Sequence, residues 1–234
     1  MLARPNRFIM TVREKKEGGR TLTCHCPATG RLGDVSISGV PCLFSRAADG
    51  GAMTMKRKTA GTVEAISLGP PRSRSRSWIG INQNAANRYV EFFLRAGRMP
   101  DLASGEVRRE VRLGSSRIDF LVGGTYVEVK TPLTVLPVPA GLARSRHGRF
   151  DSFDRLIRHM GELGASLREG KRAAILLCYL YDAKPFEPPA RDGQNAPILE
   201  AARRATELGV ERWQVNMRVD AEGVRMLRYF RNGG

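Results

Sequence analysis

The stretch that decides the fold is GSSRIDFLVGGTYVEVKT, residues 114–131. Apolar residues alternate with polar ones over residues 117–122 and again over residues 125–131, which is the period of a half-buried strand. Gly123 and Gly124 separate the two runs, and glycine adopts the positive φ of a two-residue hairpin turn without steric cost. We therefore predict two antiparallel strands, each with one face in the core.

The glycine turn also predicts which side chains meet. Counting outward from a two-residue turn, Asp119 faces Glu128 and Arg117 faces Lys130, with all four side chains on one face. Like charges directly opposite each other destabilise a sheet, so a cation is expected to offset the acidic pair. Mg²⁺ prefers oxygen ligands, and Lys130 could hold an attacking water or stabilise charge on a scissile phosphate.

A third acid is often useful in such a site. Glu91, on a predicted helix, and Glu110, on a predicted strand, are both candidates, and the residues leave the choice open. His159 lies on another predicted helix, where a surface or packing role is favoured over general-base catalysis. A zinc site at Cys24, His25, Cys26 and Cys42 is disfavoured, because strand alternation points Cys24 and Cys26 to one face and His25 to the other.

The chain around the hairpin predicts alternating helices and strands. The hydrophobic spacing indicates a helix from residue 82 to Gly97, then strands over 106–113, 117–122 and 125–131, a helix over 152–168, a buried strand over 173–181, a helix over 196–208, and strands over 212–219 and 224–230. This order is typical of an α/β sandwich with a mixed sheet. We place this domain at residues 81–234.

Residues 1–80 predict a separate basic β domain. Short strands are expected over 7–13, 20–26, 33–40 and 62–68, which favours a small barrel or sandwich. This segment has 14 Lys and Arg against 5 Asp and Glu. We expect nucleic-acid contacts from two basic stretches and from the hairpin arginine, although the stretches are equally compatible with solvated loops: Lys56, Arg57, Lys58, Arg72, Arg74, Arg76 and Arg117.

The whole-chain composition points to a polyanionic partner. Its 234 residues carry a formal charge of +16, and 41% are hydrophobic, enough for an ordinary core. Nucleic acid is favoured over a membrane surface. The chain lacks an apolar run long enough for a spanning helix or a signal peptide, and its four cysteines are too few for a disulfide framework. We therefore expect a cytoplasmic protein with reduced cysteines.

Residues 114–120 followed by residues 126–130 closely resemble the bacterial sugar fermentation stimulation protein A family, which carries an Asp…Glu-x-Lys nuclease signature. Further matching stretches are spread over most of the chain: His25-Cys26-Pro27, Thr29-Gly30-Arg31, Asn87-Arg88, Arg109-Glu110, Arg158-His159 and Gly170-Lys171-Arg172-Ala173. Two places depart from the family. Ala28 replaces the usual asparagine, and residues 149–155 match only loosely.

The resemblance implies an OB-like barrel over residues 1–80 and a restriction-endonuclease-like PD-(D/E)xK domain over residues 81–234. It also implies DNA binding and a nuclease that depends on Mg²⁺ or Mn²⁺. The implied metal ligands are Asp119, Glu128 and the Val129 carbonyl, with Lys130 as the catalytic lysine and Glu91 as the helix acid.

The predicted function is therefore metal-dependent phosphodiester hydrolysis, with DNA favoured over RNA as the partner. Two alternatives remain open: a DNA-binding regulatory protein that keeps the nuclease frame without turnover, and an RNA- or ribosome-associated module that uses the barrel alone. A homodimer is compatible with the predicted nuclease function and with both alternatives.

Overall fold

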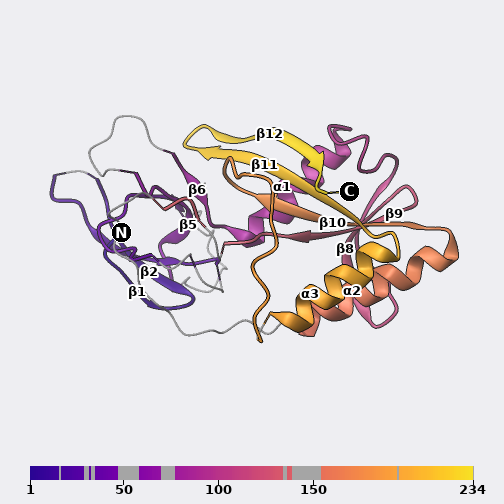
Figure 1. Ribbon diagram of the computed structural model, residues 1–234. Helices are drawn as coiled ribbons and strands as arrows, with labels where there is room; N and C mark the ends of the chain where they lie inside the picture. The colour runs from indigo at the N-terminus through magenta and orange to yellow at the C-terminus, as the bar shows by residue number, and fades with distance from the viewer. Residues whose placement is uncertain are drawn as a thin grey trace. The chain divides into compact units, whose positions relative to one another are not determined.

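The computed structural model describes residues 1–15, 17–28, 32, 35–46, 58–69, 77–133, 136–138, 154–193 and 195–233. The chain forms two compact units, each built on its own sheet (Figure 1). The first is centred on Met1–Ala85, and the second on Ala86–Pro132 and most of the later helices and strands. No helix within the described ranges is long and apolar enough to cross a bilayer.

The first unit is a small β-sheet in the order β1-β2-β3-β5-β4, with β6 also paired to β5. Its strands are β1 (Ala3–Asn6), β2 (Ile9–Arg13), β3 (Thr21–His25), β4 (Cys42–Arg46), β5 (Gly61–Ile66) and β6 (Ile79–Gly80). The pairing of β3 with β5 is parallel. Alternate residues are buried, such as Met10 and Val12 on β2. One face of the strand therefore forms core, as the sequence period predicts.

One predicted strand in this unit is wrong. Residues 33–40 were expected to be extended, but Val35 forms only an isolated bridge, and the strand comes later, at β4. Gly39 has a φ of 74°, and the Val40 amide donates to the Ile37 carbonyl across a turn. A left-handed residue ends an extended run, so the chain makes an exposed turn at Ser38 and Gly39 between the buried Val35 and Val40.

The second unit contains a six-stranded mixed sheet in the order β12-β11-β10-β9-β8-β7. Its elements are α1 (Gln83–Arg95), β7 (Val107–Leu113), β8 (Ser116–Val122), β9 (Thr125–Lys130), α2 (Asp154–Ser166), η1 (Leu167–Glu169), β10 (Arg172–Tyr179), α3 (Ala196–Glu207), β11 (Glu211–Asp220) and β12 (Gly223–Arg231). β7, β8 and β9 pair antiparallel, whereas β10 is parallel to both β9 and β11. The predicted α/β class and mixed sheet are confirmed.

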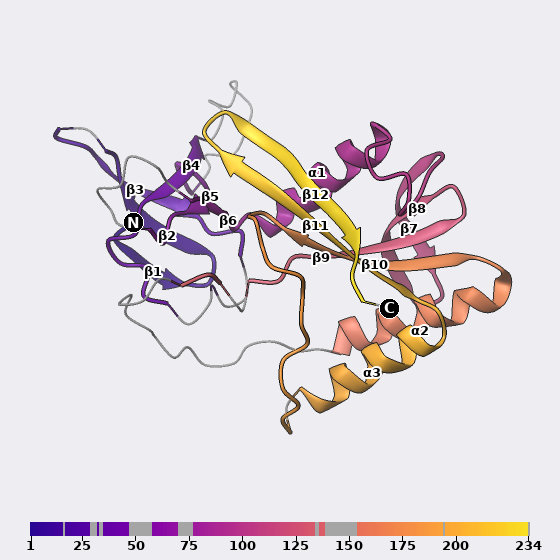
Figure 2. The same ribbon diagram turned by 45° about the horizontal axis from the view of Figure 1, so that its top comes forward.

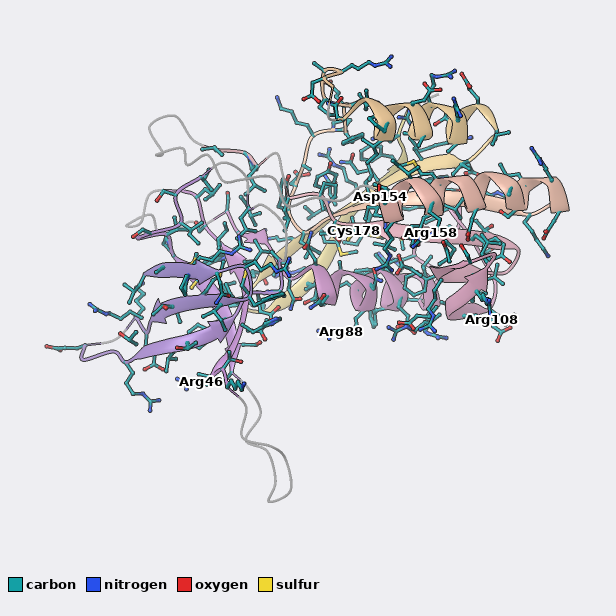
Figure 3. All side chains as sticks on the ribbon, turned by 90° about the horizontal axis from the view of Figure 1, so that it is seen from below. Arg46, Arg88, Arg108, Asp154, Arg158 and Cys178 are labelled. Carbon is teal, nitrogen blue, oxygen red and sulfur yellow. The ribbon has the colours of Figure 1, made fainter. Side chains whose placement is uncertain are left out.

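Helices cover both faces of this second sheet. Figures 2 and 3 show α2 and α3 side by side on one face and α1 on the other. The core under α2 and α3 is a cluster of Ile118, Met160, Leu163, Ala173, Ile175, Ala205 and Val210. Because β9 lies between β8 and β10 beneath helices, its polar residues are held inside the unit. This placement sets the environment of the predicted site.

Candidate metal and acid-base site

The β8–β9 hairpin has the predicted register. Val122, Leu121 and Phe120 pair in turn with Thr125, Tyr126 and Val127. Of the two turn glycines, Gly123 has a positive φ (58°) and Gly124 does not, which is the pattern of a type II′ turn. The next residues along the two strands are Asp119 and Glu128, so the turn does bring the two acids together.

Asp119 is held through its carboxylate. Oδ2 accepts a hydrogen bond from the Val129 amide at 2.8 Å, and Oδ1 accepts one from the Asn87 side chain of α1 at 2.7 Å. The Asp119 amide in turn approaches Glu128 Oε2 at 3.4 Å. The hairpin therefore links the two acids by contacts between the side chain of one strand and the backbone of the other.

The β7–β8 ladder is irregular at the same position. Arg109 pairs with Phe120 and Val111 pairs with Ile118, which leaves Glu110 facing Asp119 between them. Glu110 has a φ of 50°, the only positive value among the described non-glycine residues. A left-handed residue interrupts the pleat of a strand. Strained backbone of this kind is concentrated at functional sites in proteins.

Glu128, one of the four charged residues predicted on one sheet face, is buried. Only 2% of its side chain is exposed, because α2 covers this part of β9. Its Oε1 lies 2.6 Å from His159 Nδ1 of α2 and 2.5 Å from Lys130 Nζ. Lys130 is the more accessible of these partners, with 27% of its side chain exposed. The site therefore has a buried acid and a lysine that reaches solvent.

The surroundings of Asp119 disfavour its ionised form. Burial raises the pKa of Asp119, and the negative charge of Glu128 raises it further, while the Val129 amide, Lys130 and Asn87 act in the opposite direction. The net upward direction means that the protein compensates the negative charge of Asp119 only in part. A cation bound between the two carboxylates would relieve this penalty.

The donor set fits a hard divalent cation. Both acids present carboxylate oxygens, and Mg²⁺ usually takes one or two carboxylates from the protein and completes its shell with water and phosphate oxygens. Among the described residues, no group of three or more His, Cys, Asp or Glu side chains is arranged to hold a metal ion. Asp119 and Glu128 are the two acids that could hold one, and the Val129 carbonyl stays a predicted third ligand.

The candidate third acids are bound by arginines. Glu91 Oε1 and Oε2 lie 3.0 Å from Arg95 and 3.1 Å from Arg109, respectively. Glu110 Oε2 lies 3.1 Å from Arg117 Nη1. Neither contact joins these acids to the Asp119 carboxylate, and the residue of α1 that does reach it is Asn87.

Only some of the residues predicted to contact nucleic acid lie within the described ranges. Arg117 is exposed and paired with Glu110, so it is turned to a β7 neighbour rather than to Lys130 as predicted. Lys58 is exposed at the start of the segment that leads into β5. The remaining basic residues lie outside the described ranges: Lys56, Arg57, Arg72, Arg74 and Arg76.

Two residues of the site were not among its predicted members, and for His159 a surface or packing role was favoured. Asn87 orients Asp119 from α1, and His159 contacts Glu128 from α2. In Figure 3 their chain neighbours, Arg88 and Arg158, mark these helices on opposite sides of the sheet. Both residues belong to stretches that carried the family resemblance, which was the available signal. Hydrophobic period alone could not find them, because a buried polar residue on a helix looks the same whether it serves packing or a site.

Comparison with known proteins matches the chain over nearly its full length. Residues 2–81 match a family model described as the SfsA N-terminal OB domain, and residues 84–223 match the sugar fermentation stimulation protein RE domain. Among curated relatives, the sugar fermentation stimulation protein homolog of Symbiobacterium thermophilum is 32% identical, covering 90% of this chain and 84% of the relative. The homolog of Pseudomonas paraeruginosa is 33% identical, with coverages of 97% and 93%.

A solved structure supports the same relationship. Pyrococcus furiosus SfsA in complex with Ca²⁺ aligns with a TM-score of 0.72 at 25% sequence identity. The alignment covers 98% of this chain and 92% of that protein. The first unit is therefore an OB domain, and the α+β architecture is shared along the chain.

Proposed function

The chain belongs to the sugar fermentation stimulation protein family, and from this premise we propose that it is a DNA-binding nuclease that hydrolyses phosphodiester bonds with Mg²⁺ or Mn²⁺. The observation that carries the proposal is the half-buried Asp119 next to the buried Glu128, with Lys130 beside Glu128. Lys130 Nζ lies 2.5 Å from Glu128 Oε1, and the pKa of Asp119 is raised by burial and by the Glu128 charge.

The cation has a defined task in this proposal. When bound, it would supply positive charge to the scissile phosphate and lower the pKa of a water molecule that attacks phosphorus. Asp119 and Glu128 would hold it through carboxylate oxygens. The relative from Pyrococcus furiosus is in complex with Ca²⁺, a cation that also takes oxygen ligands, which supports the choice of a hard divalent ion.

The protein's own groups would divide the remaining work. Asn87 donates to Asp119 Oδ1 and the Val129 amide donates to Oδ2, so the carboxylate is oriented before any ligand arrives. Lys130 would donate hydrogen bonds to the phosphate oxygens, where negative charge increases in the transition state. Its partial exposure lets the ammonium group reach a substrate while its partner Glu128 stays buried.

The choice of a nucleic acid as substrate rests on charge and on exposed arginines of the elements that carry the site, and the preference for DNA rests on the family resemblance. The formal charge of +16 favours a polyanion. Arg88 and Arg158, next to the two supporting residues of the site, are both exposed, as are Arg112 and Arg117 on the neighbouring strands. Exposed arginines of this kind donate to phosphate oxygens and position the backbone without reading its sequence.

The test is a cleavage assay on the full chain. Wild-type protein is incubated with single-stranded DNA, double-stranded DNA or RNA in Mg²⁺, Mn²⁺ or EDTA. We expect DNA cleavage with either metal and none in EDTA. Lys130→Ala should lower kcat by about 10²–10³-fold, the usual loss when one donor to the transition state is removed. Lys184→Ala, which removes an exposed lysine from a loop of the same domain, should cut like wild type.

The alternative function gives a different result. If wild-type protein cuts no nucleic acid with any metal but binds DNA, and Asp119→Ala binds equally well, the nuclease proposal is refuted. The protein would then be a DNA-binding regulator that keeps the nuclease frame. Comparison of the metal-free and metal-containing binding curves also shows whether the acidic pair takes part in DNA binding.

A further inference from the structure

We infer that His159 is a positioning residue that fixes the Glu128 carboxylate so that Oε2 is directed toward Asp119. The inference rests on the proposed function, because it assigns a role to a residue that touches a metal-binding acid without binding substrate or metal. Three observations carry it: the burial of the contact, the division of partners between the two Glu128 oxygens, and the second contact of the imidazole ring.

The contact between His159 and Glu128 is buried on both sides. Each side chain is only 2% exposed, and Nδ1 lies 2.6 Å from Oε1. The residues are 31 positions apart in the chain, on α2 and β9. A buried polar group that loses its partner destabilises the folded state, so the packing of α2 on β9 favours this contact strongly. Tertiary packing therefore selects one rotamer of Glu128.

The two oxygens of Glu128 have different partners. Oε1 takes both His159 Nδ1 at 2.6 Å and Lys130 Nζ at 2.5 Å. Oε2 is approached by the Asp119 amide at 3.4 Å, a long contact. Because Oε1 is engaged by two donors, Oε2 retains the greater capacity to accept a new ligand. Oε2 is also the Glu128 oxygen that contacts Asp119, through the Asp119 amide.

The contact of Nε2, the second ring nitrogen of His159, indicates which of the two ring nitrogens donates a hydrogen bond. Arg155 Nε donates to His159 Nε2 at 3.4 Å. An arginine side chain has donors only, so Nε2 must act as the acceptor in this contact. The ring proton therefore lies on Nδ1, and Nδ1 donates to Glu128 Oε1. Partners that orient a metal-binding carboxylate in this way typically change metal affinity or activity by 10–100-fold when they are mutated.

The experiment measures Mn²⁺ affinity by calorimetric titration of the full chain, beside kcat and KM on DNA. His159→Leu keeps much of the volume and removes the donor, and we expect Mn²⁺ affinity to fall by about 10–100-fold with KM for DNA little changed. His159→Asn places its amide nitrogen near the position of Nδ1, so it should recover most of the affinity. His159→Gln places its amide near the position of Nε2 and should not.

Ser166→Ala is the matched control for general damage to α2. Ser166 is buried on the same helix, and its hydroxyl donates to the Leu163 carbonyl at 2.7 Å. We expect this variant to lose stability in EDTA and keep Mn²⁺ affinity. If Ser166→Ala lowers Mn²⁺ affinity as much as His159→Leu does, the effect reflects helix damage and the inference is overturned.

The outcomes separate this inference from the nuclease proposal. Wild-type protein that binds Mn²⁺ but does not cut DNA refutes turnover, while the ratio of affinities still tests His159. Equal Mn²⁺ affinity in wild type and His159→Leu overturns the positioning role even if both cut DNA. If His159→Asn and His159→Gln are impaired equally, the donor position does not matter and the role is also overturned.

Discussion

Replacement of Asp119 by asparagine is expected to stabilise the protein when no metal is present. Burial and the Glu128 charge raise the pKa of Asp119, so its ionised form is penalised in the folded state. Asparagine keeps an oxygen that can accept from the Val129 amide, and rotation of the Asn87 amide lets it accept from the new side chain. The variant removes the negative charge and retains the contacts.

The size of the effect follows from the like-charge pair. Opposed like charges on a sheet cost up to about 1 kcal/mol. For a chain of this length, about 1 kcal/mol raises Tm by roughly 2–4 °C. The folded pKa of Asp119 lies above its unfolded value, so the penalty is present above the folded pKa and disappears as the pH falls through it. The advantage of Asp119→Asn over wild type in EDTA should therefore be larger at pH 7 than at pH 3, below the ordinary pKa of 3.8.

Added metal is expected to reverse the ranking. Mg²⁺ at 100 times its Kd would stabilise wild type by about 2.7 kcal/mol, whereas Asp119→Asn lacks one carboxylate ligand and should gain little. Thermal unfolding is followed by circular dichroism in EDTA and in Mg²⁺. Glu106→Gln, which neutralises an exposed acid of the same unit, is the control and should change neither melting curve appreciably.

Two results would refute this reasoning. One is a Tm of Asp119→Asn in EDTA that is several degrees below wild type, which would make Asp119 a structural acid whose charge the fold needs. The other is an equal rise in Tm for wild type and Asp119→Asn on adding Mg²⁺, which would place metal binding elsewhere.

Two further predictions concern the frame around the site. Gly123→Ala should destabilise the protein by at least about 2 kcal/mol in urea unfolding. The Gly123 φ of 58° is costly for alanine, and the new Cβ would overlap the Ser104 carbonyl. Gly124→Ala is the control, because a Cβ there has open space, and it should cost under about 1 kcal/mol. Burial raises the pKa of Glu162, but hydrogen bonds from Ser115 and Ser116 lower it more, so the net direction is downward. The stabilisation of the folded protein by ionised Glu162 is therefore complete above the ordinary pKa near 4.5, and it is lost as the pH falls through the pKa of Glu162 in the folded state. Glu162→Gln should be less stable than wild type at pH 7, and the two proteins should become equally stable in acid.

The hairpin could be predicted from sequence because its signals are local. Alternation over residues 117–122 and 125–131 defined both strands, and the paired glycines set the register that brings Asp119 next to Glu128. The helices and strands of the second unit came from the same kind of short-range period. Where the local signal was ambiguous, as over residues 33–40, the prediction placed a strand where the chain makes a turn.

The environment of the hairpin depended on long-range packing. Alternation placed Glu128 on the same strand face as Lys130, but it carried no information on what covers that face. In the structure β9 lies inside the sheet and the acid is buried against His159 of α2. Asn87 contacts Asp119 from α1, which is 32 positions away in the chain. Partners contributed by other elements leave no periodic signal in the hairpin itself.

The sequence by itself determined the strand pair, its register and the residue types of the candidate site, because strand period and turn chemistry act between near neighbours. Only the tertiary structure decided which oxygen of Glu128 is engaged, which helix orients Asp119 and how far each charge is removed from water. Those properties depend on how α1 and α2 pack on the sheet, and packing is set by the whole unit.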